Sequence, residues 1–360
     1  MLAAVLAATG CGGERDAVPE LASGSAVPDR CVHRAVTASA TVTFVAKGAA
    51  WALDPATERL ACLFPVSAPG PFTWGPRGDR ALLARLEVKA IADAPQRPAT
   101  GIDPPASSWG RPIGKSIVFV GREGRALLKV HPDGGGFTDV TPVRRARYKL
   151  VAYHPSGLAF AFVLRRGRRE EIWISSNVGT SPRRLVHGRL HTGFDAVAFA
   201  KAGARLYFAA RHADGHVDVH SLELVGARSA PVIWRGALGE RVSGLAAPVN
   251  SSSPVDEVAF TVGRSCKTSR VVVVSARHRD GAEALPDEKR SRVVGWLDAK
   301  HLLVAAGGCG RKLDLYSVAA DSLRARLLAR SVDAASVRRA EPSPPPPLPP
   351  EVLRPGSGFA

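Results

Sequence analysis

Internal repetition constrains the fold of this chain more than any other feature. Five segments share one plan, in which an apolar run with an aromatic residue is followed by a Gly- or Pro-containing turn and a second apolar run. They are FTWGPRGDRALLA from Phe72, SWGRPIGKSIVFV from Ser108, LVAYHPSGLAFAFV from Leu150, AVAFAKAGARLYFA from Ala196 and, more degenerate and without Gly or Pro in its turn, VVGWLDAKHLLVAA from Val293. A further copy with a longer turn starts at Gly244. Copies that recur roughly every 40 residues indicate a repeat architecture.

The rest of each repeat is also typical of strands. After Leu150–Val163, the run Ile172–Ile174 lies between polar flanks, SNVGTSP forms a turn, and RRLV follows. Short β-branched and aromatic runs bounded by Gly, Pro and Asn predict strands, and helical periodicity is nearly absent. Four strands per repeat, repeated around a ring, predict an all-β β-propeller of four-stranded blades.

The repeats predict seven blades. Residues 41–64 supply the first, with strands TVTFVA, AAWALD and RLACLF, and the others begin near residues 72, 108, 148, 194, 243 and 292. The second blade is short and runs into the Pro-rich stretch Ala94–Ser107. Six blades plus an insert therefore remain an alternative.

Two turns resemble those of a known repeat family. Trp74–Gly78 (WGPRG) and Tyr153–Gly157 (YHPSG) resemble the W-S-P-D-G-like corner between the first two strands of a blade in TolB-type, WD-like propellers. The resemblance spans most of residues 41–330 and implies this fold. Because Pro and Gly set the turn conformation, the corner is structural, and Arg77 and Ser156 replace the family's Asp.

The N-terminus resembles a bacterial lipoprotein signal. In MLAAVLAATGCGG, a short apolar stretch leads through Thr9 and Gly10 to Cys11, the position that is lipidated in that family. No Lys or Arg precedes Cys11, so a plain apolar leader is the alternative. The resemblance implies an extracytoplasmic protein, in the periplasm or at the cell surface, held to the bacterial membrane by its lipid.

Composition divides the chain into four parts. We expect a signal segment over 1–10, a flexible tether over 11–30, the propeller over 31–340, and a Pro-rich, unpacked tail over 341–360 that contains SPPPPLPP.

The remaining four cysteines are expected to form disulfides, as is usual outside the cytoplasm. Three pairings are conceivable, and four unpaired core cysteines are the alternative. Cys266 and Cys309 fall in the same turn of adjacent blades, which favours their pairing and leaves Cys31 with Cys62. No C-x-x-C pair exists, so a cysteine-based metal site is not expected.

Common catalytic motifs are missing or incomplete. Gly110–Ser116 (GRPIGKS) is one residue shorter than the phosphate-binding P-loop, and it joins two expected strands. The G-x-S-x-G nucleophile elbow does not occur. We therefore expect neither nucleotide binding nor serine-peptidase chemistry, and no cofactor.

One histidine-rich segment could hold a metal ion. On a strand, His216, Asp218 and His220 share one face, and imidazole and carboxylate groups suit a divalent ion. The alternative is a polar turn and a strand whose side chains bond the neighbouring blade. A metal here would support the second functional hypothesis, a propeller hydrolase or lyase acting at the mouth of the central channel.

The chain is strongly basic, with 49 Lys+Arg, 32 Asp+Glu and a net charge of +17. Many arginines fall in turns between second and third strands, and more, such as Arg145 and Arg147, fall in the links between blades; both kinds of loop lie on one edge of a propeller. The candidate binding residues are Arg122, Arg125, Arg165, Arg166, Arg168, Arg169, Arg264 and Arg311.

Such an edge favours an anionic partner, either an acidic protein or an envelope polymer, and a merely solvated edge is the alternative. Few aromatics accompany the arginines, which argues against nucleic acid. The leading hypothesis is a monomeric, non-catalytic scaffold.

Overall fold

The computed structural model describes most of the repeat region and part of the C-terminal segment. The described residues are 27–32, 36–37, 39–66, 72–74, 80–83, 88–90, 107–109, 116–121, 124–131, 138–187, 191–200, 203–226, 229–248, 255–286, 288, 290–307, 309, 312–338 and 348–353. None of the helices among them is long and apolar enough to cross a membrane.

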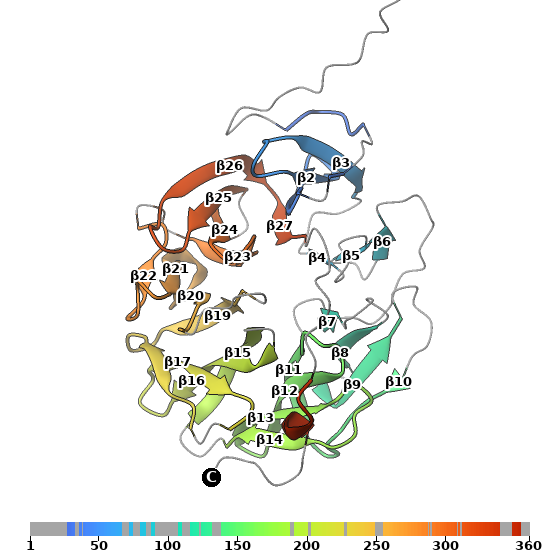
Figure 1. Ribbon diagram of the computed structural model, residues 1–360, viewed down its shortest axis with the longest axis vertical. Coiled ribbons are helices and arrows are strands. Elements are labelled where there is room, and N and C mark those ends of the chain that lie inside the picture. Colours follow the sequence, from blue (N-terminus) through green and yellow to red (C-terminus); the bar gives the residue numbers. More distant parts are fainter. Residues whose placement is uncertain are drawn as a thin grey trace, which may run out of the picture.

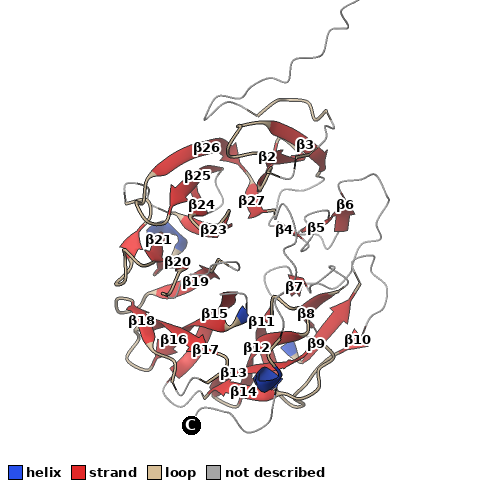
Figure 2. Cartoon of the chain, viewed as in Figure 1, coloured by secondary structure: helices blue, strands red, loops and turns tan. Residues whose placement is uncertain are grey.

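The described strands form seven antiparallel sheets, six of four strands and one of three, arranged in a ring (Figures 1 and 2). We number them blades 1 to 7 in chain order. Blade 1 contains β1 (Val42–Ala46), β2 (Ala49–Leu53), β3 (Leu60–Pro65) and β27 (Ala334–Val337). Blade 2 contains β4 (Phe72–Trp74), β5 (Arg80–Leu83) and β6 (Val88–Ala90). Blade 3 contains β7 (Ser107–Trp109), β8 (Ile117–Gly121), β9 (Ala126–Val130) and β10 (Thr138–Asp139).

The other four blades are each continuous in sequence. Blade 4 contains β11 (Arg147–Tyr153), β12 (Ala159–Arg166), β13 (Arg169–Ser176) and β14 (Arg183–Val186). Blade 5 contains β15 (His191–Ala200), β16 (Arg205–His212), β17 (Val217–Glu223) and β18 (Val232–Arg235). Blade 6 contains β19 (Arg241–Ala246), β20 (Val258–Gly263), β21 (Arg270–Val274) and β22 (Ala282–Glu283), and blade 7 contains β23 (Arg292–Trp296), β24 (His301–Ala306), β25 (Leu313–Ala319) and β26 (Ala325–Val332). The seven-bladed propeller is the fold that the repeats predict.

The second strand of blade 4 shows why these segments are apolar throughout. Every residue from Ala159 to Leu164 is fully buried, on both faces of the sheet. Phe160 and Phe162 pack against blade 3, whereas Ala161 and Val163 pack against blade 5. The hydrophobic core is therefore divided into layers (slabs), one between each pair of neighbouring blades. Because an inner strand contacts two such layers, it must be apolar on both faces.

The ring is closed by the last strand of the propeller. β27 pairs antiparallel with β1, so the innermost strand of blade 1 comes from the far end of the chain. The innermost strands of blades 3 to 7 and β27 then contact their neighbours in succession around the centre (Figure 1). The repeat pattern predicted only three strands for blade 1, because the fourth comes from the other end of the propeller.

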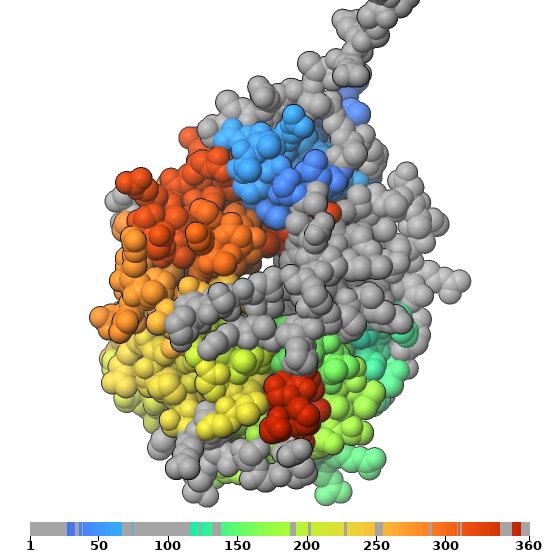
Figure 3. All heavy atoms as spheres, viewed as in Figure 1, coloured from blue at the N-terminus to red at the C-terminus, as the bar shows by residue number. Residues whose placement is uncertain are grey.

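Both ends of the propeller extend further than the sequence indicated. Val27, placed in the tether, is buried against blade 1, and the ammonium of Lys47 donates to its carbonyl at 2.6 Å. At the other end, the expectation of an unpacked tail is wrong for residues 348–353. The 3-10 helix η5 (Pro350–Leu353) fully buries Val352 against blades 4 and 5, where Figure 3 shows it in red.

The two disulfides have the expected pairing. Cys266 joins Cys309, with 5.6 Å between their Cα atoms, and Cys31 joins Cys62, with 5.3 Å. Cys266 begins the 3-10 helix η4 (Cys266–Thr268) between β20 and β21, and Cys309 lies between β24 and β25. The bond therefore links the same turn of blades 6 and 7.

Candidate functional site

The sheet topology places the predicted basic loops on one edge of the ring. Because successive strands within a blade are antiparallel, the turn between its second and third strands lies on the same edge as the link to the next blade. The described members of the predicted set all lie in such turns or at the strand ends next to them: Arg125, Arg165, Arg166, Arg168, Arg169 and Arg264. Arg122 and Arg311 lie outside the described residues. We call this side of the propeller the basic edge.

Part of the basic edge is hollowed between blades 3 and 4. A cavity of about 670 Å³ opens to solvent there. Arg125 lines it from the β8–β9 turn and Arg165 from the β12–β13 turn, together with Gly167. Arg145 and Arg147 line it from the link that leads into β11. The four arginines are exposed. We call this feature the arginine hollow.

A buried tyrosine holds the link in place. The hydroxyl of Tyr148 donates to the carbonyl of Val143 at 2.6 Å and accepts from the amide of the same residue at 2.9 Å. Burial raises the pKa of Tyr148 to about 12, so at neutral pH the hydroxyl keeps the proton that it donates. Val143 and Ala146 are themselves buried, and their packing holds the backbone of the segment that carries Arg145 and Arg147.

The arginine hollow carries uncompensated positive charge within the described part of the chain. No acidic side chain is among its described lining residues. The ion pairs that join described residues include none of these four arginines. Arg165 donates from Nε to the carbonyl of Gly167 at 3.0 Å, which orients it without neutralising it.

Nearby basic groups with acidic partners provide a contrast. The ammonium of Lys149 lies 3.3 Å from a carboxylate oxygen of Glu170 and 3.7 Å from one of Asp195. Arg211 donates to Asp195 at 2.9 Å. Of these three pairs, Lys149–Asp195 crosses from blade 4 to blade 5, whereas the other two lie within blade 4 and within blade 5. All three are partly buried, and their charges are neutralised where the two blades meet. The four arginines of the hollow, in contrast, form no ion pair of this kind with the described residues.

The other predicted arginines do not join the hollow. Arg166 lies over the ring of Trp173, 5.9 Å from its centroid, and Arg168 and Arg169 are exposed in the same turn as Arg165. Arg264 belongs to blade 6, where it lies near Glu240. Arg145 and Arg147 were recognised only as basic link residues, because the sequence does not show that three separate loops meet.

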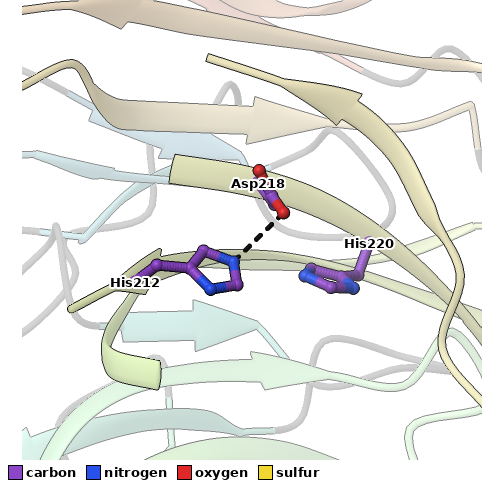
Figure 4. A group of neighbouring side chains, drawn as sticks. All are labelled: His212, Asp218 and His220. Carbon is purple, nitrogen blue, oxygen red and sulfur yellow. Dashed lines mark ion pairs between the residues drawn. The ribbon is translucent and has the colours of Figure 1, made fainter. Parts of the chain in front are cut away.

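The histidine-rich segment forms a cluster whose membership differs from the expectation. His212, Asp218 and His220 place one ligand atom each within 4.8 Å of one another (Figure 4). His216 is not a member, since its Nδ1 lies 3.0 Å from the carbonyl oxygen of Gly236. The strand register explains the exchange: Ala210 pairs with Asp218, so His212, two residues on, shares the face of Asp218.

The cluster does not lie where the enzyme hypothesis needs it. His212 ends β16, and Asp218 and His220 are in β17, the second and third strands of blade 5. The innermost strand of that blade is β15, which separates the cluster from the centre of the ring. The structure therefore offers these residues no place at the mouth of a central channel.

Comparisons with known proteins bear on the fold. No protein-family model matches the chain, and no curated protein matches it. Among solved structures, one from a study of two prolyl endopeptidases aligns with a TM-score of 0.54 and 13% identity over 82% of this chain and 47% of that chain. The dihydro-heme d1 dehydrogenase NirN aligns with a TM-score of 0.50 and 13% identity, over 88% of this chain and 79% of that chain.

TolB from Acinetobacter baumannii also aligns, with a TM-score of 0.48 and 13% identity over 84% of this chain and 66% of that chain. At such identities the similarity to solved structures shows the fold alone. The chain is a β-propeller, the fold that the repeats and the corner motifs at Trp74 and Tyr153 indicated.

Proposed function

We propose that this protein is a non-catalytic, extracytoplasmic propeller scaffold that binds an acidic protein or an anionic envelope polymer through its basic edge. The observation that carries the proposal is the arginine hollow, in which Arg125, Arg145, Arg147 and Arg165 converge from three loops. The proposal includes a lipid anchor at Cys11, which holds the propeller at the membrane, and a monomeric state.

The chemistry of the hollow favours an anionic ligand. Four exposed guanidinium groups around one cavity repel one another unless an anion or solvent screens them. Each guanidinium presents a planar fork of donors that matches a carboxylate, sulfate or phosphate group. An acidic chain that runs across the hollow would therefore gain several charge-assisted hydrogen bonds at once.

The architecture supports binding and an oxidising compartment. The described contacts between blades 4 and 5, such as Lys149–Asp195 and the hydrogen bonds of Lys149 and Glu170 to Phe194, do not involve the four arginines, which leaves these available to a partner. Both disulfides join residues distant in sequence, and such bonds persist in secreted and periplasmic proteins. TolB-like propellers, which share this fold, support a protein partner in the cell envelope.

The test is reversal of charge at the hollow. We expect the triple variant Arg125→Glu, Arg147→Glu, Arg165→Glu to bind poly-glutamate and a carboxylated polysaccharide at least tenfold more weakly than the natural chain. The measurement is the dissociation constant at two salt concentrations, and a pull-down from crosslinked native envelopes then shows which kind of partner is lost.

The matched control places the same charge change on the opposite edge. Arg59, Arg277 and Arg324 are exposed in turns between third and fourth strands. Their replacement by Glu changes the net charge equally but leaves the hollow intact. Equal losses in the two triple variants, or no loss in either, would overturn the proposal, because binding would then depend on overall charge or not on this edge at all.

A further inference from the structure

The cluster of His212, Asp218 and His220 lies in the slab between blades 4 and 5. On this face of blade 5, Phe208 pairs with His220 and Ala210 pairs with Asp218 across the β16–β17 ladder. The ring of His220 stacks on that of Phe208, with 4.9 Å between centroids and 4° between planes. Two adjacent strands of one sheet therefore carry all three side chains, as Figure 4 shows.

We propose that His212, Asp218 and His220 form a binding site for one divalent transition-metal ion of the zinc class. Two imidazoles and one carboxylate are a ligand set that Zn²⁺ uses where a fourth position stays open. Ligand atoms on one tetrahedral Zn²⁺ lie roughly 3.4 Å apart, given bonds of about 2.0–2.1 Å. The three ligand atoms lie within 4.8 Å of one another. Side-chain rotations that move them by about 1 Å would therefore bring them to the spacing around one Zn²⁺.

The tautomer of His220 is fixed in the form that a metal needs. Its Nδ1 lies 3.0 Å from the carbonyl oxygen of Ala230, and a carbonyl only accepts. Nδ1 therefore carries the proton, and the lone pair of the neutral ring is on Nε2. A carbonyl that accepts from the far nitrogen is also the usual support of a metal-bound histidine.

Asp218 supplies the negative charge. Its side chain is 1% exposed, and a carboxylate buried to that extent needs positive partners. His212 Nε2 lies 3.1 Å from Oδ2, and Arg235 Nε lies 3.2 Å from Oδ1. A cation between His212 Nε2 and Oδ2 would give the carboxylate a second positive partner, while Arg235 keeps its bond to Oδ1.

Arg235 does not block the site. It contacts Oδ2 as well, at 3.3 Å from its second nitrogen, and would compete with a cation if it were held there. Its side chain is however 69% exposed and can turn toward solvent. His212 is 26% exposed although its Nε2 is buried, so an ion would enter by a rotation of the His212 side chain.

The experiment uses the full chain in a Cys11→Ser background, since Cys11 is the cysteine outside the two disulfides. After treatment with chelator, Zn²⁺ is titrated by calorimetry, and the bound metal is counted by mass spectrometry. We expect one Zn²⁺ per chain and a higher melting temperature with Zn²⁺ than without it. Mg²⁺, which prefers oxygen ligands, should not compete.

Two variants and one control make the result specific. His212→Ala removes a partly exposed ligand, and Asp218→Asn removes the charge; each should weaken Zn²⁺ binding at least 100-fold. His216→Ala alters a neighbouring histidine outside the cluster and should leave the affinity within twofold. If one variant fails to fold, the other variant and the His216→Ala control together show whether Zn²⁺ binds at the cluster.

The proposal is overturned if the natural chain takes up no stoichiometric Zn²⁺, or if His216→Ala weakens binding as much as His212→Ala. Because the cluster and the arginine hollow share no residue, this result is independent of the charge-reversal experiment.

Discussion

The indole Nε1 of Trp74 donates a 2.7 Å hydrogen bond to Oγ1 of Thr43, and that hydroxyl donates at 2.6 Å to the carbonyl of Ser336. Trp74 is in β4 of blade 2, Thr43 is in β1 and Ser336 is in β27. The chain of bonds therefore crosses from blade 2 to both strands that close blade 1. Thr43 is fully buried and Trp74 is 7% exposed.

Thr43→Val should destabilise the propeller. Valine keeps the shape of the side chain but removes the acceptor for the indole and the donor for Ser336. We expect a loss of about 1–3 kcal/mol, the usual cost of leaving buried polar groups without partners. Urea unfolding at pH 7.5 measures it. Trp74→Phe completes a double-mutant cycle, and strictly additive effects would show that the two side chains are not coupled.

His154 makes stability depend on pH below neutrality. Its ring is buried between Ser156 Oγ, at 2.8 Å, and the carbonyl of Gly203, at 2.9 Å, and burial lowers its pKa from 6.5 to about 4. Unfolding therefore takes up a proton between these values. The contribution of neutral His154 to the free energy of unfolding is complete above pH 6.5. It falls by about 3 kcal/mol as the pH drops through 6.5 toward 4.

Comparison with His154→Gln isolates this contribution. Glutamine can bond both partners but does not titrate near pH 5. The free energy of unfolding, measured by urea at pH 7.5, 6.0, 5.0 and 4.0, should fall more steeply in the natural chain than in the variant. Parallel curves would contradict the assignment, because the carboxylates that both proteins share titrate alike.

Gly203→Ala should be far more damaging than alanine at an open turn. A Cβ at Gly203 would lie 2.2 Å from Nε2 of His154, and the backbone has φ = +90°. Gly48→Ala is the matched control, since its φ is +72° but no atom lies within 4 Å of the added carbon. We expect the free energy of unfolding to fall by about 1 kcal/mol in Gly48→Ala and by several kcal/mol in Gly203→Ala. Equal shifts in melting temperature would contradict the close approach.

Removal of the Cys266–Cys309 disulfide should lower stability by about 2–4 kcal/mol, because the bond closes a loop that spans a whole repeat. The double variant Cys266→Ser, Cys309→Ser is compared with the natural chain in denaturant, and a change within 0.5 kcal/mol would contradict the prediction. Mass spectrometry without reductant checks that the natural chain carries both bonds.

Local sequence patterns predicted most of the fold. The apolar run over Ala159–Leu164 and the corner at Tyr153–Gly157 identify a buried strand and its turn without any distant information, and each repeat reinforces the same interpretation. Cys266 and Cys309 were paired by aligning two repeats. The predictions from these features were correct because the strands of a blade are neighbours in sequence.

Features that join distant segments could not be predicted in this way. Thr43 and Ser336 are 293 residues apart, and nothing in either segment indicates that they meet. Arg145 and Arg165 line one hollow only because two loops adjoin. Val352 follows a run of prolines, yet it is buried, and its carbonyl accepts from Nε of Arg183 at 2.8 Å.

The pairing of β27 with β1 has a consequence for how the protein is made. A chain that leaves the ribosome N-terminus first presents β1 with a vacant hydrogen-bonding edge until β27 has followed. A nascent chain that stops short of Ala334 would keep that edge open and would tend to associate with other β-rich chains. The hydrogen bonds that close blade 1 can therefore form only once residues 334–337 have been added to the growing chain.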